Sequence, residues 1–461
     1  MTLRDRPEGG RSPIAALLSP CGTGNLGDAA IQDSILHHVR RILPLARFVG
    51  ITLCPMDTEI RHGIPGFPID VLQRGMPYGV EAGTIAEAEL NRFPATIHDL
   101  RVRAQALTVS REFLSDSRVS RLRRIMRRLK RESQHFMLAL ALLRNVDVLV
   151  ISGGGQIDDL WGGAGQHPFA LFKWTLAARI RRRPILMVSV GSGRLRSASS
   201  RWLVRRTLMR VGYATCRDRH SARVVGTLGS RRVEVVPDLA LSYPAAALAG
   251  PPSGAESALR LGIAPMAFGD SRFWPENMAQ QFSHYIESLT QLACRMAESG
   301  TSITMFSTTP SDAQVAKELY ATVLARLPAK VRPNLVLTVP KTVKSLTEAL
   351  QTMDVVVASR LHAVILATDC MRPVVAIACE WKVERFLFDL DLSRYCHRFA
   401  AILPDELYET VVALVADHGR VAARMEAFRK QAEAKLEPEH QIVAQVLAGG
   451  PVPAVRTSQR P

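Results

Sequence analysis

Short apolar segments, glycine-rich turns and amphipathic helices alternate along most of this sequence, and this alternation restricts the fold more than any other feature. The first apolar segment, 14–19, is followed by the glycines of 22–27 and by a helical pattern from about Asp28. Repeated strand–turn–helix units are typical of parallel sheets that are covered by helices. We therefore predict an α/β protein.

The pattern occurs in both halves of the chain. Further strands are predicted at 47–53, 146–152, 184–190, 213–216 and 233–236, and then at 259–265, 302–306, 335–339, 355–358 and 374–378. Between the halves, 244–254 is rich in alanine, proline and glycine, a composition typical of linkers. We predict two Rossmann-like domains that face a cleft, where ligands of such sheets bind.

The predicted boundaries follow from these segments. We expect an N-terminal domain over 1–243, a linker at 244–257, a C-terminal domain over 258–448 and a flexible tail at 449–461. The N-terminal domain carries a helical, basic insertion near 55–145, and the last helices are expected over roughly 405–437.

Composition argues against several classes of protein. The longest uninterrupted apolar run, 136–143, is far shorter than the roughly 18 residues that a membrane-spanning helix needs. The N-terminus lacks the apolar stretch typical of a signal peptide. Seven scattered cysteines form no Cys-x-x-Cys pair, so neither a zinc site nor a disulfide framework is indicated. These features favour a cytoplasmic protein with no dedicated metal site.

The net charge of +17 is unevenly distributed. Eight Arg or Lys and no acid lie between Arg118 and Arg131, and six more lie between Arg194 and Arg210, again with no acid. Such segments attract phosphates, anionic lipid or nucleic acid, although an arginine-rich solvated surface explains them as well. With 6% aromatic residues and no recognisable binding module, nucleic acid is the least favoured partner.

The first candidate ligand-binding turn, 22–27, has the form Gly-x-Gly-x-x-Gly and contains Gly24, Asn25 and Gly27. Its glycines allow backbone N–H groups to approach an anion or a sugar closely, and Asp28 is a candidate helix cap. A dinucleotide site also needs an acid at the end of the second strand, and that acid is missing or late here. The alternative is a tight structural turn.

The second candidate turn follows the strongly apolar strand predicted to end at 152. It consists of Gly153, Gly154 and Gly155, followed by Gln156 and Asp158. A glycine turn at the end of a buried strand is a typical place for a ligand to contact the backbone, and the two polar side chains suit sugar hydroxyls. The alternative is a flexible connection.

Two further elements carry basic side chains directly after predicted strands. Arg217 follows 213–216, where a guanidinium suits a carboxylate or a phosphate, and a structural Arg–Asp pair is the alternative. Arg360 and His362 follow 355–358 at the start of a helix, where free N–H groups favour an anion. Histidine there can exchange a proton near neutral pH, so we favour a functional role over a structural one.

Taken together, four elements resemble the polysaccharide pyruvyl transferase family. These elements are Asn-Leu-Gly-Asp at 25–28, Ser-Gly-Gly-Gly at 152–155, Arg-Asp at 217–218 and Ser-Arg-Leu-His at 359–362. They occur in the same order as in the family, and the resemblance covers roughly 14–395. The resemblance implies a GT-B-like pair of Rossmann-like domains, with an acceptor in the N-terminal domain and phosphoenolpyruvate in the C-terminal one.

The resemblance also implies roles for individual residues. Arg217, Arg360, Leu361 and His362 would bind the donor, and His362 would supply or relay a proton. From the residue types themselves, we expect the 24–27 and 153–158 segments to contact the acceptor and Asp28 or Asp158 to accept a proton from a sugar hydroxyl. Phosphoenolpyruvate acts as co-substrate in this chemistry, so no cofactor is expected.

The basic segment 118–131 leads to a separate hypothesis. Val119, Leu122, Met126 and Leu129 fall on one face of a helix, and arginines fill much of the rest. Such a helix suits the inner surface of an anionic membrane, and hence an acceptor built on a lipid diphosphate. The alternative, which we favour, is a surface helix whose apolar side packs on its own domain.

Two other functions remain open. A glycosyltransferase of the same architecture would use a nucleotide sugar, but no acidic ribose partner is evident in the second half. A non-catalytic glycan-binding protein would retain the fold without the chemistry, and the presence of Arg217, Arg360 and His362 argues against it.

Overall fold

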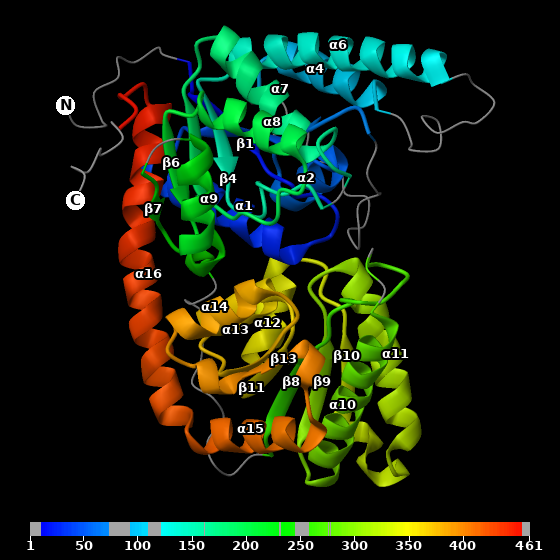
Figure 1. Cartoon of the computed structure of the whole chain (residues 1–461). Coiled ribbons are helices and arrows are strands. Elements are labelled where there is room, and N and C mark those ends of the chain that lie inside the picture. The colour runs from blue at the N-terminus through cyan, green and yellow to red at the C-terminus, as the bar shows by residue number, and fades with distance from the viewer. Residues whose placement is uncertain are drawn as a thin grey trace. The chain divides into compact units, whose positions relative to one another are not determined.

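The computed structural model describes residues 11–72, 93–108, 121–160, 162–229, 232–244, 258–274, 276 and 278–453. They divide into two compact units, and Figure 1 labels most of their helices and strands. The first unit comprises 1–23, 28–239 and 434–461, and the second comprises 24–27 and 240–433.

The first unit is built on a seven-stranded sheet of order β3-β2-β1-β4-β5-β6-β7, in which every pair is parallel. Its strands are β1 (Ile14–Leu18), β2 (Arg47–Thr52), β3 (Gly66–Pro68), β4 (Val148–Ser152), β5 (Ile185–Val190), β6 (Tyr213–Cys216) and β7 (Glu234–Val235). β1, β4 and β5 are buried along their whole length, because helices cover both faces of a parallel sheet.

Helices join these strands in the pattern that the sequence predicts. They are α1 (Leu26–Ile42), α2 (Pro55–His62), α4 (Ala95–Ala106), α6 (Arg121–Asn145), α7 (His167–Ile180), α8 (Ala198–Leu208) and α9 (Arg219–Gly229). α4, α6, α7 and α8 pack against one another in that order (Figure 1). The predicted insertion near 55–145 is helical, as expected, but it also contributes the edge strand β3.

The second unit contains a six-stranded parallel sheet of order β10-β9-β8-β11-β12-β13. Its strands are β8 (Arg260–Ala264), β9 (Ser302–Phe306), β10 (Leu335–Thr338), β11 (Val355–Ala358), β12 (Val374–Ala378) and β13 (Cys396–Arg398). Its helices are α10 (Ala279–Glu298), α11 (Pro310–Arg326), α12 (Val343–Gln351), α13 (Leu361–Asp369), α14 (Trp381–Asp389), α15 (Pro404–Ala416) and the first part of α16 (His418–Leu447).

In both sheets the order in which successive strands are added reverses at an equivalent point. In each sheet the first strand of the unit lies between the second and the fourth, so that β1 neighbours β4 and β8 neighbours β11. At such a point the connections leave on opposite sides, and ligands of open α/β sheets bind beyond the carboxyl ends of the two strands. The predicted turns 22–27 and 153–155 follow β1 and β4, and Ser359 and Arg360 follow β11.

One predicted domain boundary is wrong. The C-terminal domain was expected to extend to 448, but residues 434–461 belong to the first unit. The last helix ends at Leu447 instead of near 437, and its end packs in the first unit through Glu439, which hydrogen bonds to Tyr213 and Thr215 of β6. The main segment of the first unit ends at Leu239, close to the predicted 243, whereas most of the predicted linker, 245–257, lies outside the described residues.

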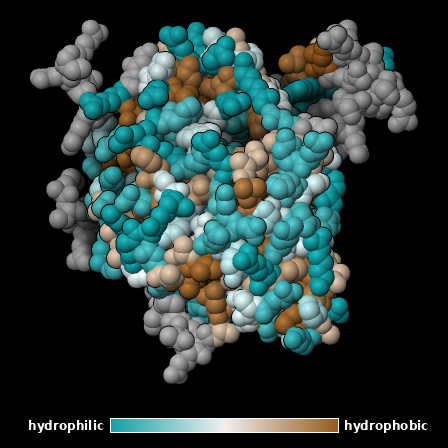
Figure 2. Space-filling model, turned by 60° about the horizontal axis from the view of Figure 1, so that its bottom comes forward, coloured by the Kyte–Doolittle hydropathy of each residue, from teal (hydrophilic) through white to brown (hydrophobic). Residues whose placement is uncertain are grey.

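Within the described part of the chain, no helix combines the length and the apolar character needed to cross a membrane. On the face shown in Figure 2, apolar residues form small separate patches among hydrophilic ones. All seven cysteines are described, and no disulfide joins them.

Candidate functional site

The turn after β1 contains the residue that caps the N-terminus of α1. Gly22 and Gly24 have φ of 105° and 77°, which only glycine adopts readily. The Asn25 side chain accepts a hydrogen bond from the Gly27 N–H at 3.0 Å, so Asn25 caps α1. The suggestion that Asp28 caps the helix is therefore wrong, because α1 begins two residues earlier and Asp28 lies in its first turn.

The same segment joins the second unit. The Leu26 N–H donates to the Thr308 carbonyl at 2.9 Å, so two N–H groups at this helix end are already engaged. Gly27 lies against the His362 imidazole, and a Cβ on Gly27 would lie 2.1 Å from ring atoms Cγ and Nδ1. Gly27 and His362, more than 300 residues apart in the chain, therefore form one cluster in the second unit. Gly24, Asn25 and Gly27 thus lie in the unit of the predicted donor residues, and not in the N-terminal domain to which the acceptor was assigned.

Arg360 is the N-cap residue of α13 and is held by a buried carboxylate. Its Nη2 donates to Asp312 Oδ1 at 2.8 Å, and its Nε donates to Oδ2 of the same group. The Arg360 side chain is 21% exposed, whereas that of Asp312 is 1% exposed. Burial alone would lower the pKa of Arg360, but Asp312 outweighs it and raises that pKa.

Buried hydroxyl groups fix the backbone beside Arg360. The Ser359 and Tyr285 hydroxyls are 2.6 Å apart, and the Tyr285 oxygen accepts from the Met266 N–H at 3.0 Å. Burial raises the pKa of Tyr285, so it remains a phenol. This hydrogen-bond chain connects the loops after β8 and β11. These are the two neighbouring strands at which the strand order of the second sheet reverses.

In the first unit, the turn after β4 also has a backbone conformation that requires glycine. Gly153 and Gly154 have φ of 46° and 65°. A Cβ on Gly154 would lie 3.5 Å from Asp28 Oδ1, whereas the space around Gly155 is open. The structure therefore places two predicted acceptor residues, Asp28 and Gly154, side by side.

The polar residues after this turn have different environments. Gln156 is fully buried and donates to the Leu18 and Ser152 carbonyls, while its Oε1 pairs with His167 at 2.9 Å. Its amide therefore holds the turn in place. Asp158 is partly exposed and accepts from the Leu160 N–H at 2.5 Å.

Arg217 belongs to the first unit and is paired there with acids. Its Nη1 lies 2.8 Å from Asp238 Oδ2 and its Nε lies 3.9 Å from Asp218, and only 7% of its side chain is exposed. Burial alone would lower the pKa of Arg217, but Asp238 and Asp218 outweigh it and raise that pKa. Gly191 is required beside it, since a Cβ there would lie 2.5 Å from the Arg217 Nε.

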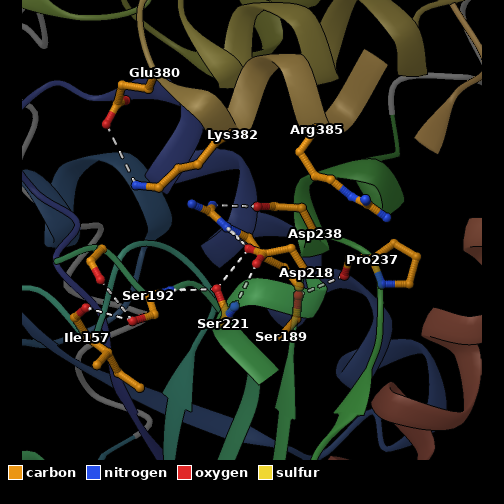
Figure 3. A network of polar contacts seen from close by, with 12 residues as sticks. Ile157, Ser189, Ser192, Asp218, Ser221, Pro237, Asp238, Glu380, Lys382 and Arg385 are labelled. Atoms are coloured by element: carbon orange, nitrogen blue, oxygen red, sulfur yellow. Dashed lines mark hydrogen bonds and ion pairs between the residues drawn. The ribbon is translucent and has the colours of Figure 1, made fainter. Parts of the chain in front are cut away.

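A polar network surrounds this pair (Figure 3). Asp218 accepts from the N–H and the hydroxyl of Ser221, whose Oγ in turn accepts from the Ser192 N–H at 2.7 Å. Ser189 stands in an irregular part of β5 with φ of 51°, and its hydroxyl donates to the Pro237 carbonyl at 2.7 Å. Irregular strand residues of this kind are common beside functional sites.

Sequence reasoning missed the acids that orient both arginines. Asp238 follows Val-Pro after the predicted strand 233–236, and Asp312 lies three residues after Thr309, whose side chain caps α11. The capping pattern of Thr309 and Asp312 was visible, but nothing in it linked Asp312 to Arg360.

One group among the described residues brings three potential metal-ligating side chains close together. Ligand atoms of His38, Glu437 and His440 lie within 4.8 Å of one another. The two imidazole rings are stacked, however, with centroids 4.4 Å apart and planes 9° apart. Nitrogen lone pairs lie in the ring plane, so parallel rings cannot both point at one ion, and Glu437 is already paired with Arg41 at 2.7 Å.

Comparison with known proteins gives a family and a fold. A family model described as polysaccharide pyruvyl transferase matches residues 25–380. Comparison with curated protein sequences gives no match.

Three solved structures illustrate the similarity of fold. A Listeria monocytogenes protein named for UDP-N-acetylglucosamine 2-epimerase is 8% identical with a TM-score of 0.55, over 94% of this chain and 97% of that one. Anabaena HepE in complex with UDP is 12% identical with a TM-score of 0.50, over 95% and 100%. A Rickettsia africae glycosyltransferase is 10% identical with a TM-score of 0.50, over 95% and 99%. The predicted two-domain α/β fold of the GT-B type is thus confirmed.

Proposed function

Because the chain belongs to the polysaccharide pyruvyl transferase family, we propose that it transfers the pyruvyl group of phosphoenolpyruvate onto a sugar as a cyclic ketal. The acceptor would be a precursor of an exopolysaccharide or another cell-surface glycan. The observation that carries this proposal is the cluster of Gly27, Arg360 and His362 in the second unit.

The chemistry of the donor fits this cluster. Phosphoenolpyruvate carries a carboxylate and a phosphate, and a guanidinium at a helix start suits either group. Asp312 fixes the fork of Arg360 from one side, and α13 begins at Leu361, whose N–H lies at the positive end of the helix dipole. In this proposal Arg360 and Leu361 bind the donor, and His362 beside them transfers a proton.

The reaction requires one proton delivered to carbon and two removed from hydroxyls. His362 protonates the methylene carbon of phosphoenolpyruvate, and the positive charge develops at C2. One sugar hydroxyl attacks C2 and phosphate leaves with the bridging oxygen; a second hydroxyl then closes the ring. Of the two hydroxyl protons, one restores His362 and the other is carried away by phosphate. No cofactor is part of this proposal.

The acceptor is assigned to the first unit. Asp28 and Gly154 lie side by side there, Gly155 faces open space, and Asp158 is partly exposed. These residues offer carboxylates, and at Gly155 exposed backbone, to sugar hydroxyls. Either carboxylate could relay the second hydroxyl proton to phosphate. Arg217 remains a predicted donor ligand, although Asp238 and Asp218 already occupy part of its guanidinium.

Phosphate release tests the proposal directly. Wild type would be incubated with phosphoenolpyruvate and a panel of free and lipid-linked glycosides, in parallel with Arg360→Ala, His362→Ala and the exposed control Arg223→Ala. We expect acceptor-dependent release that the first two changes abolish and the control retains. Transfer from nucleotide sugars, with no release from phosphoenolpyruvate, would establish the glycosyltransferase alternative instead. Binding of glycans without either reaction would indicate a non-catalytic protein.

The start of α6 supports membrane contact as a second part of the proposal. Of the predicted apolar face, Met126 and Leu129 are each 58% exposed, and the neighbouring Ile125 is 47% exposed. These residues therefore do not pack on their own domain, contrary to the alternative that the sequence favoured. Val119 lies outside the described residues, and so does the side chain of Leu122. We propose that this helix rests on the anionic inner face of the membrane, which suits a cytoplasmic enzyme and a lipid-linked acceptor.

Vesicle sedimentation tests this membrane contact. We expect wild type to bind vesicles of phosphatidylcholine with phosphatidylglycerol but not vesicles of phosphatidylcholine alone. Replacing Ile125, Met126 and Leu129 by serine should abolish binding. Met137→Ser is the matched control, because Met137 is an equally exposed residue of the same helix. Equal binding by the triple variant would refute the membrane contact.

A further inference from the structure

A pocket lined by arginines lies at the amino end of the first unit's sheet. It has a volume of about 560 Å³, and its walls include Arg179 and Ile180 at the end of α7, Arg182 and Arg183 in the following turn, and Arg210 after α8. Pro184, Ile185, Gly212 directly before β6, and Val452 complete it. No acidic residue is among its lining residues.

Two of the four arginines are held in place by the protein. The Arg183 Nε and Nη2 donate to the carbonyls of Leu143 and Arg144 at 3.0 and 2.7 Å. Arg210 lies over the Phe172 ring, with its Cζ 4.8 Å from the centroid. Burial lowers the pKa of Arg210, and the neighbouring charge of Arg206 adds to this effect. No carboxylate lines the pocket to offset the charges of Arg183 and Arg210.

The other two arginines are available to a ligand. Arg179 and Arg182 are exposed and form no ion pair with any described acid. The backbone of Arg182 has φ of 54°, a conformation that L-residues rarely adopt. The tight turn after α7 therefore fixes the direction in which its side chain leaves the backbone.

The pocket is separate from the candidate site. Gly212 precedes β6 and Arg217 follows it, so the two lie at opposite ends of one strand, about 16 Å apart at roughly 3.3 Å per residue. A ligand in the pocket would therefore not contact the polar network around Arg217.

We propose that this pocket binds a diphosphate group. Four guanidinium groups supply positive charge for a ligand with about three negative charges, and the exposed Arg179 and Arg182 can each bind phosphate oxygens in pairs. A cavity of this size also exceeds what a single phosphate fills, and Ile180, which is 53% exposed, and Val452 offer apolar contacts to a group attached to the diphosphate. The diphosphate could be attached to a prenyl chain, attached to a nucleoside, or present as free pyrophosphate.

Calorimetric titration with inorganic pyrophosphate, at an ionic strength matched with chloride, tests the site. We expect wild type to bind pyrophosphate and Arg179→Ala/Arg182→Ala to bind it at least tenfold more weakly. Both side chains are exposed, so the double variant should keep its fold, which circular dichroism would verify. Arg223→Ala, an exposed arginine of the same unit outside the pocket, should bind as wild type does.

A second variant separates this pocket from the candidate donor site. Arg360→Lys should retain pyrophosphate binding, because Arg360 lies in the other unit. Loss of binding in Arg360→Lys, or unchanged binding in the double variant, would overturn the inference. Titration with a prenyl diphosphate in detergent micelles and with a nucleoside diphosphate then identifies the source, since the natural ligand should bind more tightly than pyrophosphate. Equal affinity for all three would indicate a free anion.

Discussion

The backbone of Gly27 lies directly against the imidazole of His362, and no side chain larger than hydrogen fits between them. A Cβ at position 27 would lie 2.1 Å from the ring of His362, so the ring would have to move by about 1 Å to reach an ordinary contact distance. Displacements of this size reduce catalysis by about 100-fold. We expect Gly27→Ala to lower kcat/KM for phosphoenolpyruvate by about that factor, as measured by acceptor-dependent phosphate release.

Gly419→Ala is the matched control, because Gly419 is also helical and has open space around its Cα. It should leave kcat/KM unchanged. Wild-type activity in Gly27→Ala would exclude His362 from the reaction.

Asp312 determines how Arg360 presents its guanidinium. In Asp312→Asn one oxygen is retained for the Ala267 N–H, but an amide NH₂ then faces an arginine N–H. We expect KM for phosphoenolpyruvate to rise about tenfold, equivalent to about 1.4 kcal/mol, with a smaller change in kcat. Asp405→Asn, which alters an exposed ion pair, serves as control. An unchanged KM would mean that Arg360 does not bind the donor.

The Arg217–Asp238 pair allows a structural role to be separated from a binding role. Removing one member of a buried pair costs about 3–5 kcal/mol, because the other charge is left buried. We expect Arg217→Met to lower the free energy of unfolding in urea by about that amount, and Arg217→Met/Asp238→Leu to recover most of it. A loss below about 1 kcal/mol would indicate that Arg217 contributes little to folding and is available for a ligand.

Glu439 should make the first unit less stable as the pH rises. Burial raises its pKa to about 7, whereas an unfolded chain has the ordinary value near 4.5. The folded state therefore keeps a proton that the unfolded state loses between these values, and up to about 3 kcal/mol of stability disappears as the pH rises through 7.

Glu439→Gln should remove this dependence. Its free energy of unfolding should equal that of wild type near pH 4.5 and exceed it at pH 8. The comparison is made between the two proteins, because burial lowers the pKa of His440 to about 3 and gives an opposite slope in both. Parallel stability profiles would show that the carboxyl of Glu439 ionises normally.

The strand and helix pattern was predictable because each element carries its own signal. Strands such as 355–358 and 374–378 were predicted with the observed bounds, since buried parallel strands are continuous apolar runs. The motif residues at the strand ends were visible for the same reason. The order of the strands in each sheet could not be predicted from these local signals. That order places β1 beside β4 and β8 beside β11, with the predicted turns at their carboxyl ends.

The sequence by itself determined the fold class, the family and the residue types that a charged donor needs. Only the tertiary structure decided which partner each residue has: Gly27 against His362, Asp312 beneath Arg360, Asp238 on Arg217, and the end of α16 on β6. The physical reason is the sequence separation over which each interaction acts. Hydrophobic periodicity and capping act over a few residues and can be read locally, whereas these contacts join segments between 21 and more than 300 residues apart, which only the packed chain brings together.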